Sequence, residues 1–474
     1  MKKSKHLKNE YKSMVLGLQA ATELVTFTVL YYVIWVFGYS GEHLPQYMGS
    51  GKYLLAFIYL VMCYVFITNI DGFQFGNLRR FDLCVAQWIG LFLTNFLTYF
   101  LLCLLANRMV DLLPMLILMG LQVLLALLLV FSHTALYFRL FKPHAMVMVY
   151  GSDNAVSMKI KMDERRDKYH IDRMISASEK LDRILQVVAD YESVILNDVP
   201  TPIRNDLLKF CYKHQIRTYV VPKISDILLR GAHPISTFDT PLLLVRGYGL
   251  SMRNRIFKRI MDIAISLPVA VITAPIMLIT AIAIKLEDGG PVFYKQRRVT
   301  LNGKEFDILK FRSMIVDAEK DGHSIPAQGH DPRITRVGRF IRASRIDELP
   351  QLLNILKGDM SIVGPRPERL EHMEKYSAEI PEFSYRLKVK GGLTGYAQIY
   401  GKYNTSPYDK LRLDLMYIEN YSLVMDIKLI LLTIRVLFSK ESTEGFDEAA
   451  KREEQKEELL KELHEEEAAS GAAK

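Results

Sequence analysis

Four long apolar segments in the first third of the chain restrict its fold more than any other feature. They cover residues 14–38, 53–70, 84–106 and 112–138. Each approaches or exceeds the roughly 20 residues that an α-helix needs to cross a bilayer. The basic N-terminus leads into the first segment without a small-residue cleavage site, so we predict a retained membrane helix and not a signal peptide. Residues 1–142 are therefore predicted to form four transmembrane helices.

Positive charge in the connecting loops predicts the orientation of these helices. Basic residues lie between the second and third segments and after the fourth, at Arg79, Arg80, Arg139 and Lys142. The other two loops carry little positive charge. Because Lys and Arg are retained on the cytoplasmic side, we expect the N-terminus, the 71–83 loop and everything after the fourth segment to be cytoplasmic.

The formal net charge of +9 is unevenly distributed, because residues 441–474 form an acidic, Glu/Lys-rich tail. For this tail we predict a solvated helix or a disordered segment without catalytic residues. The basic remainder of a membrane protein indicates contact with the anionic headgroups of a lipid bilayer. Nucleic acid is the alternative partner, but no zinc-finger spacing or aromatic-basic RNP pattern accompanies the charge, so no nucleic-acid partner is predicted. The four cysteines show no CxxC spacing and indicate neither a disulfide framework nor a zinc site.

Between residues 143 and 250, short apolar runs alternate with amphipathic stretches. Strands are predicted over 145–151, 193–198, 217–221 and 241–245, and helices over 179–190 and 202–214. This alternation is typical of a small parallel α/β domain with a Rossmann-like fold. A dinucleotide site requires G-x-G-x-x-G after the first strand, but Asp153 and Val156 follow Gly151 at the other glycine positions, and an acid there would repel a pyrophosphate. We therefore predict a cytosolic domain without a cofactor, which serves in packing or dimerisation.

A fifth apolar stretch, residues 263–284, is long enough to cross the bilayer but has basic residues on both sides. Both flanks favour the cytoplasmic face, and a crossing would export the C-terminal domain. Pro268 and Pro275 remove backbone donors and favour a break or sharp bend. We predict a re-entrant helix–break–helix over 258–285, with a kinked spanning helix as the alternative. The apolar run over 421–438 carries interspersed charges and predicts an interfacial helix, with a buried core helix as the alternative.

Residues 331–354 combine an acidic pair, Asp347 and Glu348, with closely spaced arginines. The arginines are Arg333, Arg336, Arg339, Arg342 and Arg345. A three-residue spacing rotates successive side chains by about 60° on a helix, so these arginines would spiral around it. We predict a loop over 331–337, a helix over 338–344, and a further helix that begins at Pro350 and ends at Gly358. The acidic pair would then lie at a helix N-terminus, where backbone N–H groups favour anions.

This concentration of charge indicates a phosphate site. Surface ion pairs are the alternative, but each contributes at most about 1 kcal/mol to stability. Arginine forks bind phosphate oxygens, Mg²⁺ is typically held by one or two carboxylates plus substrate phosphates, and a neighbouring free carboxylate could attack phosphorus. Further basic candidates are Arg366 in VGPRPE, and Lys310 and Arg312 at the end of a hairpin with an Asn302-Gly303 turn signal.

Several long segments, in order, resemble the bacterial sugar transferases, or monotopic phosphoglycosyl transferases. They are FKRIMDIAISLPVAVITAPI, PVFYKQRRV with GKEFDILKFRSM, DPRITRVGRFIR, IDELPQLLNILKGDMSIVGPRPE, and GLTGYAQIYGK with LDLMYI. This resemblance covers about residues 253–440. Residues 1–250 resemble the large polyisoprenyl-phosphate hexose-1-phosphate transferase branch. The expected fold class is thus an α-helical membrane part, a degenerate Rossmann-like α/β domain, and a catalytic domain over 251–440 with a re-entrant helix and interfacial helices.

The resemblance implies an enzyme that moves a sugar-1-phosphate from a UDP-sugar to undecaprenyl phosphate and releases UMP. It implies Asp347 as the nucleophile, which forms a covalent phosphosugar intermediate, and Glu348 as a ligand of Mg²⁺. It also implies a multi-pass protein of the bacterial inner membrane with its catalytic domain on the cytoplasmic face.

The family's phosphate-contacting arginines correspond to Arg342 and Arg366. Our further candidates for substrate-phosphate binding are Arg345, Arg339, Lys310 and Arg312, while Arg333 and Arg336 are predicted to be structural or membrane-facing. The proline that breaks the re-entrant helix corresponds to Pro275, and the basic residue that anchors this helix to Arg259. The chain departs from the family pattern at Ala274, where many members have serine, and at Lys390-Gly391, where many have a basic residue followed by proline.

The sugar is not identified by these motifs. Similarity to capsule and exopolysaccharide enzymes favours glucose or galactose, with an N-acetylated or diamino sugar as the alternative. A non-catalytic scaffold of polysaccharide assembly is a rival, against which the intact Asp347, Glu348 and Arg366 argue. A transporter is disfavoured because the first four segments contain few charges apart from Glu23. The α/β domain makes a homodimer plausible.

Overall fold

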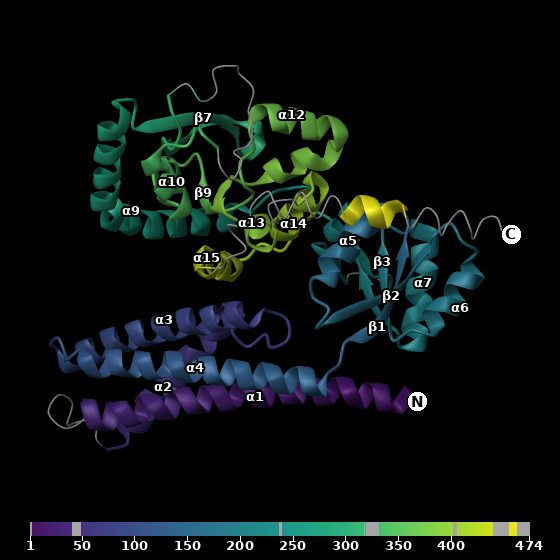
Figure 1. Ribbon diagram of the computed structural model, residues 1–474, viewed down its shortest axis with the longest axis horizontal. Coiled ribbons are helices and arrows are strands. Elements are labelled where there is room, and N and C mark those ends of the chain that lie inside the picture. Colours follow the sequence, from purple (N-terminus) through teal and green to yellow (C-terminus); the bar gives the residue numbers. More distant parts are fainter. Residues whose placement is uncertain are drawn as a thin grey trace. The chain divides into compact units, whose positions relative to one another are not determined.

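The computed structural model describes residues 2–39, 49–236, 239–316, 318, 331–401, 405–438 and 455–461 (Figure 1). The chain forms two compact units, one up to Tyr219 and one from Val220 to Val436. The charged tail predicted over 441–474 lies outside the described residues, except for 455–461.

The four predicted membrane segments are helices. They are α1 (Lys2–Gly38), α2 (Gly51–Asn69), α3 (Arg80–Ala106) and α4 (Leu113–Leu140). Each contains a stretch long and apolar enough to cross a membrane; among the described residues a fifth helix, α9 (Met252–Asp288), also qualifies. Their shared core is rich in aromatic side chains, and the rings of Tyr31 and Tyr59 stack with their centroids 4.1 Å apart.

Polar side chains inside this bundle are hydrogen-bonded to one another. Glu23 of α1 is fully buried; its carboxylate accepts a hydrogen bond from Gln87 Nε2 at 2.6 Å and lies 3.0 Å from His133 Nδ1. Asn95 donates to Gln122 Oε1 at 2.8 Å in a second network. Such contacts tie membrane helices together, because hydrocarbon provides no other partner for a polar group. We therefore interpret Glu23 as an interhelical contact.

The rest of the first unit contains the parallel α/β sheet. The strands are β1 (His144–Tyr150), β2 (Tyr169–Ser176), β3 (Ser193–Asn197) and β4 (Arg217–Val220), and the helices are α5 (Asn154–Asp163), α6 (Leu181–Ala189) and α7 (Thr201–His214). The sheet order is β2-β1-β3-β4, and β1 pairs in parallel with both β2 and β3. Sequence reasoning missed β2 and α5. It also misassigned the strand over 241–245: this strand is β6 (Leu242–Leu244), which pairs antiparallel with β5 (His233–Ile235) outside the parallel sheet.

The carboxyl ends of β1 and β3 approach each other closely where a doubly wound sheet would bind a nucleotide. A Cβ at Gly151 would lie 2.3 Å from the Asp198 carbonyl oxygen, so only glycine fits. Ser152 Oγ donates a hydrogen bond to Asp198 Oδ2 at 2.9 Å. Gly151 thus permits close packing of the two strand ends.

The second unit begins with α8 (Ile224–Arg230) and contains the long helix α9 and a series of short elements. These elements are β7 (Phe293–Val299), β8 (Glu305–Phe311), α10 (Arg336–Ala343), α11 (Gln351–Lys357), β9 (Ser361–Val363), α12 (Leu370–Glu379), β10 (Gly392–Thr394), α13 (Tyr396–Tyr400), α14 (Pro407–Glu419) and α15 (Leu423–Phe438). The predicted hairpin is confirmed as β7–β8, with Asn302 and Gly303 both at positive φ in its turn. β9 and β10 form a separate parallel pair.

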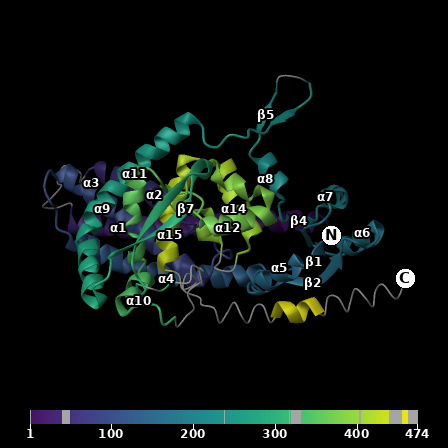
Figure 2. The ribbon, with the colours of Figure 1, turned by 90° about the horizontal axis from the view of Figure 1, so that it is seen from above.

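Helix α9 differs from the predicted helix–break–helix because both prolines lie within one continuous helix. Figure 1 shows α9 running along one edge of the unit and then turning toward β7, and Figure 2 shows the same turn from above. A bend without interruption is a usual response to prolines, which remove i→i−4 hydrogen bonds but preset a helical φ. Of the 18 consecutive residues that form the most apolar part of α9, only 11% are buried. Its middle therefore presents a large apolar surface, typical of contact with lipid.

Helix α15 combines the two alternatives predicted for the 421–438 run. Asp426, Leu429 and Leu432 are buried, whereas Val424 and Ile427 are exposed. Asp426 Oδ2 forms a buried ion pair with Lys258 Nζ of α9 at 2.6 Å. One face of α15 therefore packs in the unit, and the other presents apolar side chains, as in interfacial helices.

Candidate active site

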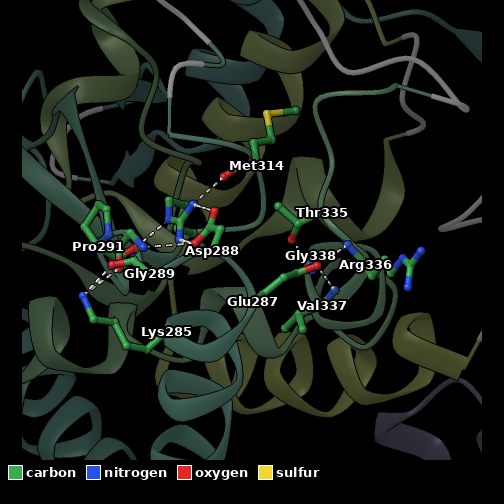
Figure 3. Close-up of polar contacts among 12 residues, drawn as sticks. Lys285, Glu287, Asp288, Gly289, Pro291, Met314, Thr335, Arg336, Val337 and Gly338 are labelled. Atoms are coloured by element: carbon green, nitrogen blue, oxygen red, sulfur yellow. Dashed lines mark hydrogen bonds and ion pairs between the residues drawn. The ribbon is translucent and has the colours of Figure 1, made fainter.

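The arginine-rich segment forms α10, whose N-terminus is attached to the end of α9. Thr335 Oγ1 accepts a hydrogen bond from Gly338 N at 2.9 Å. Glu287 Oε1 of α9 accepts a second one from Arg336 N at 2.8 Å (Figure 3). These carboxylate and hydroxyl oxygens satisfy N–H groups that have no partner within the helix. Arg333, before the helix, pairs with Asp331 at 2.6 Å, which agrees with the structural role predicted for it.

The residue between α10 and the acidic pair has a rare backbone conformation. Arg345 has φ +58°, in the left-handed region that glycine usually occupies after a helix. The chain then forms a 3-10 turn, Ile346–Glu348, before α11. The prediction that the acidic pair occupies a helix N-terminus was therefore wrong: Pro350 is the residue before α11, and Asp347 and Glu348 precede it in a turn of their own.

Helix α11 fixes the acidic pair against the β7–β8 hairpin. The buried Asn354 side chain accepts a hydrogen bond from Leu309 N at 2.9 Å and donates one to Asp307 O at 2.9 Å. This two-way contact sets the register between α11 and β8. As a result, Lys310 Nζ of β8 lies 3.2 Å from Glu348 Oε1.

A second element brings Arg366 to the same carboxylate. Arg366 NH2 lies 2.9 Å from Glu348 Oε1. The loop that carries Arg366 packs tightly on the turn before β10, since a Cβ at Gly364 would lie 2.4 Å from Lys390 O. The buried Arg386 donates to the Arg366 carbonyl oxygen at 3.0 Å and pairs with Asp414 at 2.6 Å. These contacts fix the loop from behind and leave its guanidinium directed at the acidic pair.

The two neighbouring carboxylates have opposite electrostatic environments. Burial alone would raise the pKa of Glu348, but Arg366 and Lys310 outweigh it and hold this pKa well below its ordinary value. Burial and the adjacent Glu348 carboxylate raise the pKa of Asp347, against the opposing effect of Lys310, Arg342 and Arg345. Groups whose environments separate their pKa values in this way usually have different chemical roles.

Asp347 has no hydrogen-bond or ion-pair partner among the residues that the structure describes, and the same holds for the side chains of Arg342 and Arg345. Both arginines act electrostatically on Asp347. Within the described part of the chain, a carboxylate without a partner thus lies in the field of two guanidiniums without a partner. This combination can accept a phosphate group and offer it an attacking oxygen.

Two other candidates make no hydrogen bond or ion pair with the acidic pair among the described residues. Arg312 is buried; its guanidinium pairs with Asp288, and its Nε donates to Pro291 O at 2.6 Å. This engagement favours a structural role in attaching α9 to the end of β8. Arg339 is exposed on α10, one turn before Ala343.

Arg259, which we predict to anchor the re-entrant helix, joins α9 to the end of α11. Its guanidinium donates to the carbonyl oxygens of Ile355 and Leu356, each at 2.6 Å. These carbonyls end α11 and lack partners within the helix, and a cation there is favoured by the helix dipole. Pro275 lies in the exposed, apolar part of α9.

Sequence reasoning missed the residues that support these groups. Asp262, Asp288, Arg386 and Asp414 received no role, although all make charge-assisted hydrogen bonds in this unit. Charged residues inside apolar surroundings are rarely buried without a partner. An acid such as Asp262 at the start of an apolar helix was the available signal.

The acidic pair fits a Mg²⁺ that is shared with a substrate. Within the described part of the chain, no group of three or more His, Cys, Asp or Glu side chains is arranged to hold a metal. One or two carboxylates are sufficient when substrate phosphates supply further oxygens, which is the usual Mg²⁺ arrangement. Glu348 is the residue that would hold it, beside Asp347.

Comparison with known proteins shows the family to which residues 253–440 are similar. The profile of the family described as bacterial sugar transferase matches residues 253–440. A UDP-glucose:undecaprenyl-phosphate glucose-1-phosphate transferase of Caulobacter vibrioides is 42% identical over 219 residues, which cover 44% of this chain and 81% of the relative. The chain belongs to the bacterial sugar transferase family.

Other family members match a smaller share of their own length. A Klebsiella pneumoniae UDP-glucose:undecaprenyl-phosphate glucose-1-phosphate transferase is 35% identical over 54% of each chain, so the match spans about half of that relative. A putative undecaprenyl-phosphate N-acetylgalactosaminyl 1-phosphate transferase of Bacillus subtilis is 54% identical over 130 residues, which are 27% of this chain and 72% of the relative. The matched family region contains α10, the acidic pair and Arg366.

The strained backbone at Arg345 yields a test of this site's construction. Replacing Arg345 by glycine or by alanine removes the same guanidinium, but only glycine adopts a left-handed φ without steric cost. We expect Arg345→Gly to be more stable than Arg345→Ala by about 1 kcal/mol. Thermal unfolding of the purified protein in detergent measures the difference. An alanine variant at least as stable as the glycine variant would contradict the backbone described here.

Proposed function

We propose that this chain transfers a sugar-1-phosphate from a UDP-sugar to undecaprenyl phosphate and releases UMP. The observation that carries the proposal is the Asp347 carboxylate, which has no hydrogen-bond or ion-pair partner among the described residues and lies beside Glu348. Lys310 and Arg366 hold Glu348 ionised, and Arg342 and Arg345 act electrostatically on Asp347. The relatives in Caulobacter vibrioides and Klebsiella pneumoniae are named for this transfer with glucose.

The reaction proceeds in two displacements at one phosphorus atom. An Asp347 carboxylate oxygen attacks the sugar-bearing phosphorus of the UDP-sugar, and the bond from that phosphorus to the bridging oxygen breaks, so that UMP leaves with the electron pair. A phosphate oxygen of undecaprenyl phosphate then attacks the same phosphorus. The bond to Asp347 breaks, which regenerates the carboxylate and forms a lipid-linked diphosphate sugar. Each step needs only one acceptor in the site.

The cations around Asp347 serve this chemistry by position. Arg342 and Arg345 bind the diphosphate near Asp347, and Arg366 and Lys310 keep Glu348 ionised. Bound Mg²⁺ would neutralise negative charge on the phosphoryl group in transfer. Arg339 remains a further candidate for phosphate binding, and Arg312 serves the attachment of α9.

The attachment of α9 supports a re-entrant position in the membrane. Arg259 near its start binds the end of α11, and Glu287 at its end binds the start of α10. Both ends of the helix thus contact the same compact unit, while its apolar middle is exposed. A straight crossing would place these ends on opposite sides of the bilayer, about 30 Å apart. We propose that α9 enters and leaves the cytoplasmic face of the bacterial inner membrane, so that the site meets both a soluble nucleotide sugar and a lipid phosphate.

We propose glucose as the transferred sugar and the initiation of exopolysaccharide or capsule repeat units as the role. The Bacillus subtilis relative named for N-acetylgalactosamine, with 54% identity over 130 residues, makes that sugar the second candidate. A homodimer would be compatible with either substrate.

Asp347→Asn tests the reaction. The amide keeps the shape of the side chain but is a poor nucleophile, so we expect UMP release from the purified, full-length protein to fall by about 10³-fold or more. Asp307→Asn changes an exposed carboxylate on the same β7–β8 hairpin and should leave the rate unchanged. Equal release by wild type and Asp347→Asn would refute the mechanism, and no release by wild type from any UDP-sugar would favour the scaffold alternative.

A panel of UDP-sugars with undecaprenyl phosphate tests the substrate. We expect the highest kcat/KM with UDP-glucose among UDP-glucose, UDP-galactose, UDP-N-acetylgalactosamine and a UDP-diamino sugar. A kcat/KM at least tenfold higher with UDP-N-acetylgalactosamine would replace glucose by the second candidate.

Mg²⁺ removal with a chelator should abolish the release of UMP with every sugar.

A further inference from the structure

The first turns of α9 contact both chain segments that form the Glu348–Arg366 ion pair. Arg259 binds the carbonyl oxygens at the end of α11, which follows the acidic pair. Asp262, three residues later on α9, accepts hydrogen bonds from Ser361 and Ile362 of β9. The loop after β9 carries Arg366. One short part of a membrane helix is therefore connected to both sides of the candidate active site.

Asp262 contacts β9 through one oxygen atom of its carboxylate, Oδ1. Its Oδ1 accepts a hydrogen bond from Ser361 Oγ at 2.9 Å and another from Ile362 N at 3.0 Å. Asp262 is only 2% exposed, so these bonds are shielded from water. Hydrogen bonds to a charged acceptor are about twice as strong as neutral ones. The contact therefore fixes the position of β9 on α9.

The strand held by Asp262 is too short to be positioned by its own sheet. β9 has three residues and pairs only with the three-residue β10 among the described strands. The loop that follows it, Gly364–Pro367, carries Arg366 with two prolines that limit backbone freedom. Because this loop follows β9 directly, a displacement of β9 would also shift Arg366, against the contact that Arg386 makes with the loop.

We propose that Asp262 is a positioning residue for Arg366. Through Arg366, it couples the position of α9 to the acidic pair. This inference rests on the proposed transferase function. Asp262 helps to place the guanidinium of Arg366 beside Glu348 through its two hydrogen bonds to β9, and neither of these bonds involves the substrate. The alternative is that Asp262 serves only to stabilise the folded unit.

Three single variants separate these roles in full-length protein reconstituted in lipid nanodiscs. Asp262→Ala removes both acceptors, and we expect kcat/KM for the UDP-sugar to fall by about 10–100-fold, as for a misplacement of about 1 Å. Asp262→Asn keeps Oδ1 as an acceptor and should lose at most about threefold. Thr280→Val is the control, because it removes a hydrogen bond internal to α9, from Thr280 Oγ1 to Ile276 O at 2.8 Å, without a contact to β9.

A double-mutant cycle decides between positioning and general stability. If Asp262 acts through Arg366, Asp262→Ala should cost less than about twofold in the Arg366→Ala background, assayed at high enzyme concentration. The same 10–100-fold loss in both backgrounds, or an unchanged kcat/KM in Asp262→Ala alone, would overturn the proposal. If Asp262→Ala does not fold, Ser361→Ala, which removes one of the two bonds, should show a smaller loss with the same dependence on Arg366. Absence of UMP release from wild type would instead refute the proposed function.

Discussion

The catalytic unit depends on the attachment of α9 at both ends. A helix with an exposed apolar middle is held near its start by Arg259 and Asp262 and at its end by Glu287 and Asp288. These four side chains bind α11, β9, α10 and the end of β8, which are the elements that carry the candidate site. The geometry of the candidate site therefore depends on this helix, and in the proposed re-entrant arrangement the same helix also sets the position of the unit at the membrane.

Electrostatics then divides the acidic pair into two roles. Burial alone would disfavour the negative charge of Glu348, but Arg366 and Lys310 hold this carboxylate ionised. Asp347 remains without a partner in the described structure and has a raised pKa, because burial and Glu348 both disfavour its charge. A diphosphate with Mg²⁺ would complete the charge balance around Asp347. The positive left-handed φ of Arg345 sets the orientation of the pair at some cost in backbone energy, as is common at functional sites.

Local patterns were sufficient to predict the elements of the site but not their assembly. Turn chemistry predicts the Asn302-Gly303 turn and the end of α11 at Gly358, and apolar length predicts the four helices α1 to α4. Lys310 and Arg366 lie beside Glu348, as the charge pattern led us to expect. The engagement of Arg312 by Asp288 and of β9 by Asp262 could not be predicted, because these contacts join residues 24 and 99 positions apart. The same applies to β2, whose exposed, polar residues hide its place at the sheet edge.

Mass spectrometry of the protein itself tests the central claim most directly. The purified, full-length chain is incubated with UDP-glucose and Mg²⁺ in the absence of undecaprenyl phosphate, digested and sequenced by fragmentation. We predict a hexose phosphate attached to the peptide that contains Asp347, and its loss when undecaprenyl phosphate is added. Turnover of the UDP-sugar to a lipid-linked product with no adduct on Asp347 at any time, or an adduct on another residue, would contradict the account.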